Sequence, residues 1–289
     1  MMTQSTLFRS EFTVNCRGKL LNLTHPIVMG ILNITPDSFF DGGKFTEEKL
    51  IISRVEKMLN DGAAIIDIGA VSSRPEAKDV SEKKELERLI PVLKTLVKKF
   101  PTAIFSVDTY RSIVARKAIE TGAAIINDIS GGSFDKKMFA TVGELRVPYI
   151  LMHMQGTPQT MQKNPSYQNV MKELMVFFQK KVVELKNCGV HDIIIDPGFG
   201  FGKTVEHNFE ILRNLSLFKM LDFPLMAGVS RKSMINKILK ITPEKALNGT
   251  TVLNTIALMN YSKILRVHDV KEAKEAIKIF NFYCGKDKI

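Results

Sequence analysis

The chain has 289 residues, of which 45% are hydrophobic and 25% charged, so it can bury a large core. No stretch reaches the ~20 apolar residues of a membrane span, and the N-terminus shows no signal-peptide pattern. The net charge of +11 would suit a nucleic-acid partner, but the lysines are spread over helical segments without interleaved aromatics. We therefore expect no nucleic acid and no membrane among the partners. The charge would instead attract a small anionic substrate.

The three cysteines, Cys16, Cys188 and Cys284, are odd in number and far apart. They match neither a disulfide framework nor a metal-ligand spacing. We therefore expect reduced thiols and a cytoplasmic location.

The first expected element is a β-hairpin over 12–23, with Arg17 and Gly18 at its turn. Short apolar runs rich in Ile and Val then predict eight strands, at 27–32, 64–68, 103–107, 124–127, 148–152, 193–195, 224–227 and 264–267. Amphipathic periodicity predicts helices at 46–60, 81–99, 110–121, 170–186, 205–220, 243–261 and 269–282.

Eight strand–helix units within about 260 residues predict a (β/α)8 TIM barrel of the α/β class. We expect residues 1–26 to form an N-terminal hairpin segment that caps the bottom of the barrel, and residues 27–289 to form the barrel domain. An open, doubly wound sheet is the alternative.

The stretch DPGFGFGKT at 196–204 resembles a phosphate-binding P-loop but lacks its spacing. The first glycine of a P-loop would fall at Pro197, which has no N–H to donate. We expect the glycines to shape a tight turn that lets Asp196 face the barrel mouth. Lys203 and Thr204 are expected to begin the next helix.

Polar residues gather where the predicted strands end, which in a barrel is the end that carries the chemistry. They are Asn33, Asp108, Asn127, Asp128, Asp196, Ser230, Arg231, Lys232, Ser233, Arg266 and His268. Asp108 and Asp196 could accept N–H groups of a flat heterocycle, and Asn127 could complete its recognition. Asp128 has the simpler interpretation of a loop cap.

Arg266 and His268 are two residues apart on a strand and therefore emerge on the same side. A fixed cation beside a titratable donor suggests a phosphate or diphosphate site, opposite the acids. Asn33, on the neighbouring strand, could supply an oxygen ligand to a Mg²⁺ ion on that diphosphate.

Three further features suit a second substrate. Lys232 and Ser233 begin a predicted helix whose N-terminus would favour a carboxylate. Phe201 offers an apolar wall on the glycine-rich turn. The long loops after the first two barrel strands resemble lids, and Asp41 and Arg74 could pair when both close.

Seven segments in order closely resemble the dihydropteroate synthase family. They are MGILNITPDSFFDGG (29–43), SVDT (106–109), INDISGG (126–132), LMHMQGTP (151–158), IDPGFGFGK (195–203), SRKS (230–233) and RVHDV (266–270). The resemblance implies a (β/α)8 barrel that joins 6-hydroxymethyl-7,8-dihydropterin diphosphate to p-aminobenzoate in folate synthesis. It also implies Mg²⁺ as cofactor and a homodimer, which the last helices would form.

The resemblance assigns a role to each matching position. Asp108, Asn127, Asp196 and Lys232 would hold the pterin, whereas Asn33, Arg266 and His268 would hold the diphosphate, with Asn33 as the metal ligand. Phe39, Pro75, Phe201 and Ser233 would surround p-aminobenzoate. Asp41, Arg74 and Lys232 would take part in catalysis.

The second loop departs from the family pattern Gly-Glu-Ser-Thr-Arg-Pro-Gly. Here it reads Ala70-Val71-Ser72-Ser73-Arg74-Pro75-Glu76, so the acid is absent and a glutamate replaces the last glycine. Two other functions stay open from the residues alone. One is a methyltetrahydrofolate-dependent methyltransferase that works with a corrinoid protein, and the other is a non-catalytic barrel that binds pterin or RNA.

Overall fold

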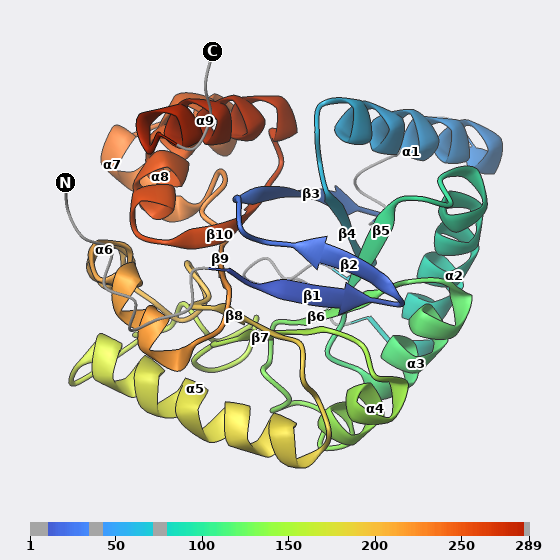
Figure 1. The fold of residues 1–289 in the computed structure, drawn as a ribbon, viewed down its shortest axis with the longest axis horizontal. Coiled ribbons are helices and arrows are strands. Elements are labelled where there is room, and N and C mark those ends of the chain that lie inside the picture. Colours follow the sequence, from blue (N-terminus) through green and yellow to red (C-terminus); the bar gives the residue numbers. More distant parts are fainter. Residues whose placement is uncertain (1–10, 35–42, 72–79, 286–289) are drawn as a thin grey trace.

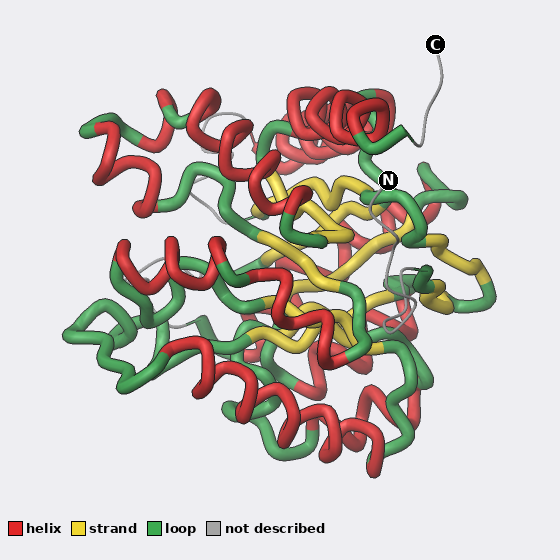
Figure 2. Tube along the Cα trace, turned by 60° about the vertical axis from the view of Figure 1, so that its left-hand side comes forward, coloured by secondary structure: helices red, strands yellow, loops and turns green. Residues whose placement is uncertain are grey.

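The barrel strands form one closed parallel sheet in the order β10-β3-β4-β5-β6-β7-β8-β9. The computed structural model describes residues 11–34, 43–71 and 80–285. The strands are β3 (Ile27–Asn33), β4 (Ile65–Gly69), β5 (Ile104–Asp108), β6 (Ile125–Asp128), β7 (Tyr149–Met152), β8 (Ile193–Asp196), β9 (Leu225–Ala227) and β10 (Ser262–Val267). Figure 2 shows them as an inner layer with the helices outside. The predicted TIM barrel is confirmed, and the open sheet is excluded.

Helices connect successive strands on the outside of the barrel. They are α1 (Gly43–Asn60), α2 (Glu82–Lys99), α3 (Ser112–Thr121), α4 (Met138–Leu145), α5 (Val170–Asn187), α6 (Val205–Arg213), α7 (Ser233–Leu239), α8 (Leu247–Met259) and α9 (Val270–Tyr283), with 3-10 turns η2 (Leu215–Leu221) and η3 (Pro243–Lys245). Side-chain N-caps begin α2 at Ser81, α5 at Asn169 and α6 at Thr204. No helix in the described part of the chain is long and apolar enough to cross a membrane.

The helix expected over 243–261 divides at Ala246 into η3 and α8, and two further segments differ from the prediction for local reasons. The helix expected over 205–220 breaks after α6 at Asn214, whose side chain donates to the Glu210 carbonyl that also accepts its backbone N–H, and continues as the 3-10 turn η2. Helix α4 was not expected. It is short, has no side-chain N-cap bond and contains Gly143, where a Cβ would lie only 1.8 Å from the Cys188 carbonyl oxygen. That glycine permits close packing while weakening the helical signal.

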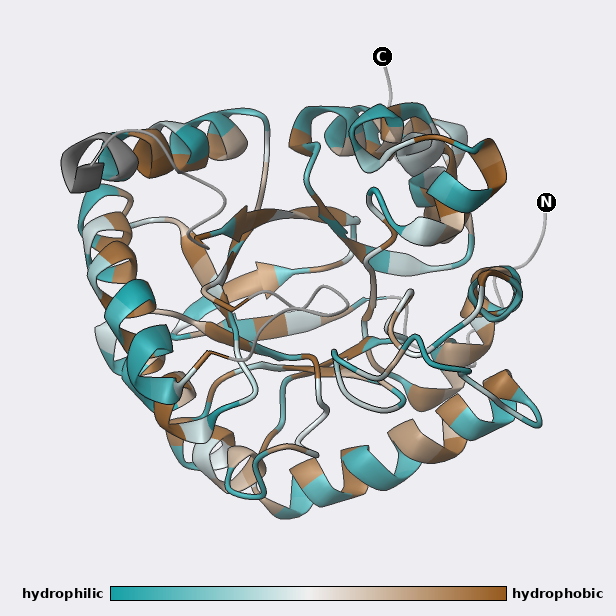
Figure 3. Cartoon of the chain, turned by 180° about the vertical axis from the view of Figure 1, so that it is seen from behind, coloured by the Kyte–Doolittle hydropathy of each residue, from teal (hydrophilic) through white to brown (hydrophobic). Residues whose placement is uncertain are grey.

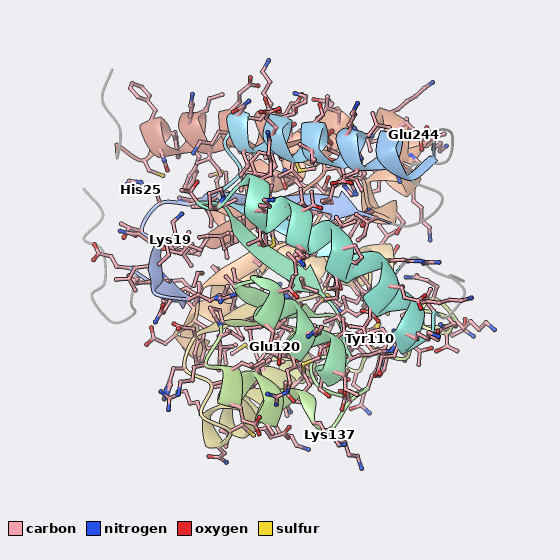
Figure 4. All side chains as sticks on the ribbon, turned by 90° about the vertical axis from the view of Figure 1, so that its right-hand side faces the viewer. Lys19, His25, Tyr110, Glu120, Lys137 and Glu244 are labelled. Atoms are coloured by element: carbon pink, nitrogen blue, oxygen red, sulfur yellow. The ribbon has the colours of Figure 1, made fainter. Side chains whose placement is uncertain are left out.

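The predicted hairpin forms and packs against one end of the barrel. It consists of β1 (Thr13–Cys16) and β2 (Lys19–Asn22), which pair in antiparallel register around Arg17 and Gly18, both with positive φ. Figure 1 shows the hairpin lying across the centre of the ring of helices. In Figure 4, Lys19 and His25 lie toward one end of the molecule, whereas Tyr110 and Glu244 lie toward the other.

One apolar side chain from every barrel strand belongs to the same inner cluster as the hairpin segment. The eight residues are Met29, Ile65, Ile104, Ile125, Ile150, Ile194, Met226 and Ile264, and they form one cluster with Val14, Cys16, Leu21 and Leu23 of the hairpin segment. The alternate strand residues belong to a second cluster, which they form with the helices. Figure 3 shows strands that are mostly hydrophobic and helices of mixed hydropathy.

Strand side chains alternate, so the next inward position lies two residues further along each strand. Five of these positions are polar or charged, namely Asp67, Ser106, Asn127, Asp196 and Arg266. All but Arg266 are buried. The barrel interior therefore changes from an apolar floor to a polar layer that opens toward the carboxyl ends of the strands.

Candidate active site

Arg266, on β10, reaches across the barrel to two carboxylates. Its Nε donates to Asp67 Oδ2 at 2.7 Å, and its Nη2 donates to Asp108 Oδ2 at 2.9 Å. Burial disfavours the charge on Arg266, but Asp67 and Asp108 outweigh this cost and raise its pKa. The structure thus differs from the expected separation of acids and cation, because Arg266 and Asp108 are in direct contact.

Asn127 joins the same network through Asp67. Its Nδ2 donates to Asp67 Oδ2 at 3.0 Å, the oxygen that also accepts from Arg266. Asp67 is fully buried and Asn127 is 2% exposed. Asp67 Oδ1 and Asn127 Oδ1 have no hydrogen-bond partner within the described ranges. Polar atoms with this degree of burial normally have partners, so Asn127 Oδ1 is suited to accept a hydrogen bond from a ligand.

The two predicted ring-binding acids, Asp196, which is buried, and Asp108, which is half-buried, hold their protons more tightly than free aspartates. Burial raises the pKa of Asp108 to about 7, although Arg266 acts in the opposite direction. Burial also raises the pKa of Asp196, while Lys232 and the Gly198 N–H limit the rise. Gly198 N donates to Asp196 Oδ1 at 2.8 Å. Raised acid pKa values within a polar layer are typical of a functional site.

Lys232 lies beside these acids at the end of the loop after β9. Burial lowers the pKa of its amine to about 8, and Asp196 partly offsets the effect. Its Nζ donates to the Phe199 carbonyl and lies 4.7 Å from the centroid of the Phe201 ring. At Gly228, a Cβ would lie 3.8 Å from Lys232 Nζ and 3.9 Å from Arg266 Cβ, so the glycine leaves room between the two cations.

His268 is held by a hydroxyl group rather than by an acid. Its Nδ1 lies 3.0 Å from Ser230 Oγ, which also accepts the backbone N–H of His268 at 3.2 Å. Burial and the nearby Arg266 lower the pKa of the imidazole to about 4. His268 is therefore neutral at pH 7. Next to this pair, Arg231 makes a two-point salt bridge to Asp269, at 2.7 and 2.9 Å.

Asn33 ends β3 in a row with Gly69 of β4 and Asp108 of β5. A Cβ on Gly69 would lie 3.5 Å from Asn33 Oδ1 and 3.8 Å from Asp108 Cβ. The glycine therefore keeps open the space between the predicted metal ligand and a predicted ring-binding acid. Among the described residues, no group of three or more His, Cys, Asp or Glu could hold a metal.

The glycine-rich turn after β8 has the predicted tight form. Gly198, Gly200 and Gly202 all have positive φ, and a Cβ at Gly198 would lie 2.0 Å from the His153 carbonyl oxygen. Thr204 caps α6 through its bond from His207 N, as expected of a helix start.

The expected role of Lys203 as a simple helix start is wrong. Its side chain is buried, and its Nζ lies within 3.0–3.2 Å of the carbonyl oxygens of His153, Gly198 and Phe201 and of His153 Nδ1. Burial lowers the pKa of Lys203 to about 7. Lys203 thus ties the turn after β8 to the end of β7.

Asp128 has the structural role expected of it. Its carboxylate accepts the Tyr149 hydroxyl at 2.6 Å and the backbone N–H groups of Ser130 and Gly132 at 2.7 and 3.0 Å. It therefore organises the loop after β6 instead of facing the polar layer.

The remaining predicted residues fall into two groups. Phe39 and Asp41 of the first loop, and Arg74 and Pro75 of the second, lie outside the described residues. Phe201 is half-buried beside Lys232, and Ser233 is exposed at the first residue of α7. The sequence reasoning missed Asp67, although counting alternate residues from Ile65 would have found it facing inward.

A closed barrel with acids, an amide and cations on its inner face defines an enzyme of the (β/α)8 class with a site for a small polar ligand. The sequence model of the pterin binding enzymes matches residues 29–268. The dihydropteroate synthase of Haemophilus influenzae is 43% identical over 265 residues, which cover 91% of this chain and 96% of that protein. The Bacillus subtilis synthase is 36% identical over 287 residues, covering 99% and 98% respectively. The chain belongs to the pterin binding enzyme family and, within it, to the dihydropteroate synthases, which are transferases.

Solved structures of the same family have the same fold. The Yersinia pestis dihydropteroate synthase in a sulfonamide complex superposes with a TM-score of 0.89 at 39% identity, covering 95% of this chain and all of that one (100%). The Xanthomonas albilineans dihydropteroate synthase in complex with 7,8-dihydropteroate gives a TM-score of 0.85 at 33% identity, covering 94% and 99%.

Proposed function

We propose that the polar layer of this barrel joins 6-hydroxymethyl-7,8-dihydropterin diphosphate to p-aminobenzoate, giving 7,8-dihydropteroate and diphosphate. The observation that carries the assignment is the single buried network of Asn127, Asp108 and Arg266 around Asp67, next to Asp196 and Lys232. The 4-aminobenzoic acid and 7,8-dihydropteroate bound by the Xanthomonas albilineans enzymes support the same choice of substrates.

In the proposed reaction, the bond between the pterin methylene and the diphosphate oxygen breaks, and the electron pair leaves with the diphosphate. The aniline nitrogen then attacks the cationic methylene and releases a proton. A neutral aniline needs no strong base, so the main demand on the protein is to stabilise separated charges. Asp108 and Asp196 would stabilise the cationic pterin, whereas Arg266 and the neutral imidazole of His268 would bind the departing anion.

The second substrate would bind near the start of α7. We assign its carboxylate to Ser233 and its ring to Phe201, with Lys232 between the two substrates. Phe39, Pro75, Asp41 and Arg74 would complete the site from the two loops outside the described residues.

Mg²⁺ would accompany the diphosphate with Asn33 Oδ1 as a protein ligand. A single amide oxygen fits this ion, because Mg²⁺ in such sites keeps several waters and binds substrate phosphates directly. When bound, the ion would neutralise charge on the diphosphate.

The assembly we propose is a homodimer formed through α8 and α9. Large apolar side chains are exposed on these helices, namely Val252, Ile256, Met259, Ile279, Phe282 and Tyr283. An exposed apolar surface of this kind suits a second copy of the chain. Sedimentation velocity should give a dimer that Ile279→Glu converts to a monomer. A monomeric wild type would refute the dimer. We also propose a cytoplasmic location, in keeping with three free thiols.

A coupled assay of diphosphate release tests the reaction. Release should require both substrates and should stop when either is omitted or when EDTA removes Mg²⁺. Turnover of a methylated folate with no diphosphate release would instead support a methyltransferase. Salt-sensitive RNA binding without turnover would support a binding protein.

A further inference from the structure

Asp67 lies in the polar layer and bonds to both Asn127 and Arg266, although it has no part in the proposed chemical steps. One oxygen, Oδ2, accepts from Asn127 Nδ2 at 3.0 Å and from Arg266 Nε at 2.7 Å, and Arg266 Nη2 lies at the same distance of 2.7 Å. Asp67 is fully buried. Its only ionic partner within the described ranges is Arg266.

We propose that Asp67 is a positioning residue that orients both Asn127 and Arg266 for binding of the pterin substrate. The inference rests on the proposed function, because it concerns the same site and the same ligand. Asp67 itself would not touch the substrate.

The first half of the argument concerns the Asn127 amide. An amide side chain can turn over and exchange its oxygen and nitrogen, and only its hydrogen bonds fix the choice. The bond to Asp67 requires Nδ2 on the Asp67 side, so Oδ1 and the second Nδ2 hydrogen remain for the ligand. Asn127 Oδ1 is buried and has no partner in the described part of the chain, as expected of an acceptor kept for a ligand N–H.

The second half concerns competition for Asp108. In the structure, Arg266 binds both Asp67 and Asp108. A pterin N–H that binds Asp108 must share that carboxylate with Arg266 or displace it. Because Asp67 holds Arg266 through Nε and Nη2, the guanidinium keeps a counter-charge when Asp108 turns to the ligand. Without Asp67, Arg266 would depend on Asp108 alone and would compete with the pterin for it.

The test is the affinity for 6-hydroxymethylpterin, which lacks the diphosphate, measured by calorimetry. Loss of hydrogen bonds at buried charged groups predicts that Asp67→Ala weakens binding by roughly 10- to 100-fold. Asp67→Asn keeps a carbonyl oxygen at the position of Oδ2 for Asn127 but removes the counter-charge of Arg266, so it should weaken binding clearly less than Asp67→Ala. Equal losses in Asp67→Ala and Asp67→Asn would overturn the proposal.

A double-mutant cycle with Asn127→Ala separates positioning from a general structural effect. If Asp67 acts partly through Asn127, Asp67→Ala should cost clearly less affinity in the Asn127→Ala background than in wild type. The same loss in both backgrounds would refute this half of the proposal. Glu85→Ala is the matched control, because it also removes a buried carboxylate from an arginine, Arg111, but on α2 and outside the polar layer.

Two further controls keep the result interpretable. If Asp67→Ala does not fold, Asp67→Ser is measured in its place, because the shorter serine side chain does not reach Arg266. The wild-type protein shows whether the proposed function itself has failed. Wild type that binds no pterin and releases no diphosphate would refute the function, whereas active wild type with an unaffected Asp67→Ala would refute only the positioning role.

Discussion

Arg266 Nη2 donates to Asp108 Oδ2 at 2.9 Å, which joins a residue assigned to the diphosphate with one assigned to the pterin. The two ends of the substrate therefore meet in one hydrogen-bonded network, which also contains Asp67. A substitution at the residues that bind one end of the substrate should therefore also change binding of the other end, because residues in one buried network do not act additively.

Loss of Arg266 should affect both turnover and stability. Arg266→Gln removes the only cation that contacts Asp67 and Asp108 within the described residues. Breaking a buried ion pair typically costs ~3–5 kcal/mol, and loss of an electrostatic donor typically lowers kcat by ~10²-fold. Urea unfolding and the diphosphate assay measure the two effects. Arg116→Gln, at an exposed pair with Glu144, is the control and should behave as wild type. Normal kinetics in Arg266→Gln would contradict the assignment.

Asp108 should make stability depend on pH. Its pKa in the fold is about 7, above the 3.8 of a free aspartate, so between these values the folded protein binds more protons than the unfolded chain. Its contribution to stability therefore falls as pH rises through this window, by up to ~1.4 kcal/mol per pH unit. The free energy of unfolding of Asp108→Asn, minus that of wild type, should increase from pH 4 to 7. A difference that stays constant would contradict the raised pKa.

Ser230 should fix the proton position on His268. Because Ser230 Oγ accepts the His268 backbone N–H, its own hydrogen can point to Nδ1 and leave the ring proton on Nε2. Nitrogen-15 NMR at pH 7 should show a neutral ring protonated at Nε2, consistent with a pKa of about 4. Ser230→Ala should raise KM for the diphosphate substrate by roughly tenfold, as expected for loss of one hydrogen bond at a buried site. A wild-type ring protonated at Nδ1 would refute this arrangement.

Lys203 should be a stability residue and not a catalytic one. Lys203→Met leaves three backbone carbonyl oxygens without their shared donor, which should cost at least ~2 kcal/mol of unfolding free energy. The Lys203 pKa is about 7 in the fold and 10.5 when free, so the unfolded chain binds more protons between these values. Its contribution to stability therefore rises with pH from about 7 to 10.5. The variant should lack this rise, whereas Lys237→Met on the surface of α7 should keep it.

The sequence predicted the barrel because eight separate apolar runs and the helices between them each carried a local signal. It also predicted which polar side chains gather at the strand ends, since residues such as Asp108 and Asp196 stand out after apolar residues. The structure adds Asp67, which lies inside a strand, in a run that reads as buried and apolar.

Contacts between residues that are far apart in the chain could not be predicted from local sequence patterns. Arg266 and Asp67 are 199 residues apart and meet only because β10 and β4 both flank β3 in the closed barrel. The partners of Lys203 are mainly backbone oxygens, which every residue possesses, so its side-chain identity alone gave no hint of the bonds it makes.

The β1–β2 hairpin affects where substrates can enter the barrel and where products can leave it. Its side chains Val14, Cys16, Leu21 and Leu23 belong to one buried apolar cluster with the eight residues at the floor of the barrel. Substrates and products should therefore enter and leave at the polar end of the barrel, so that release of the last product limits binding of the next substrate.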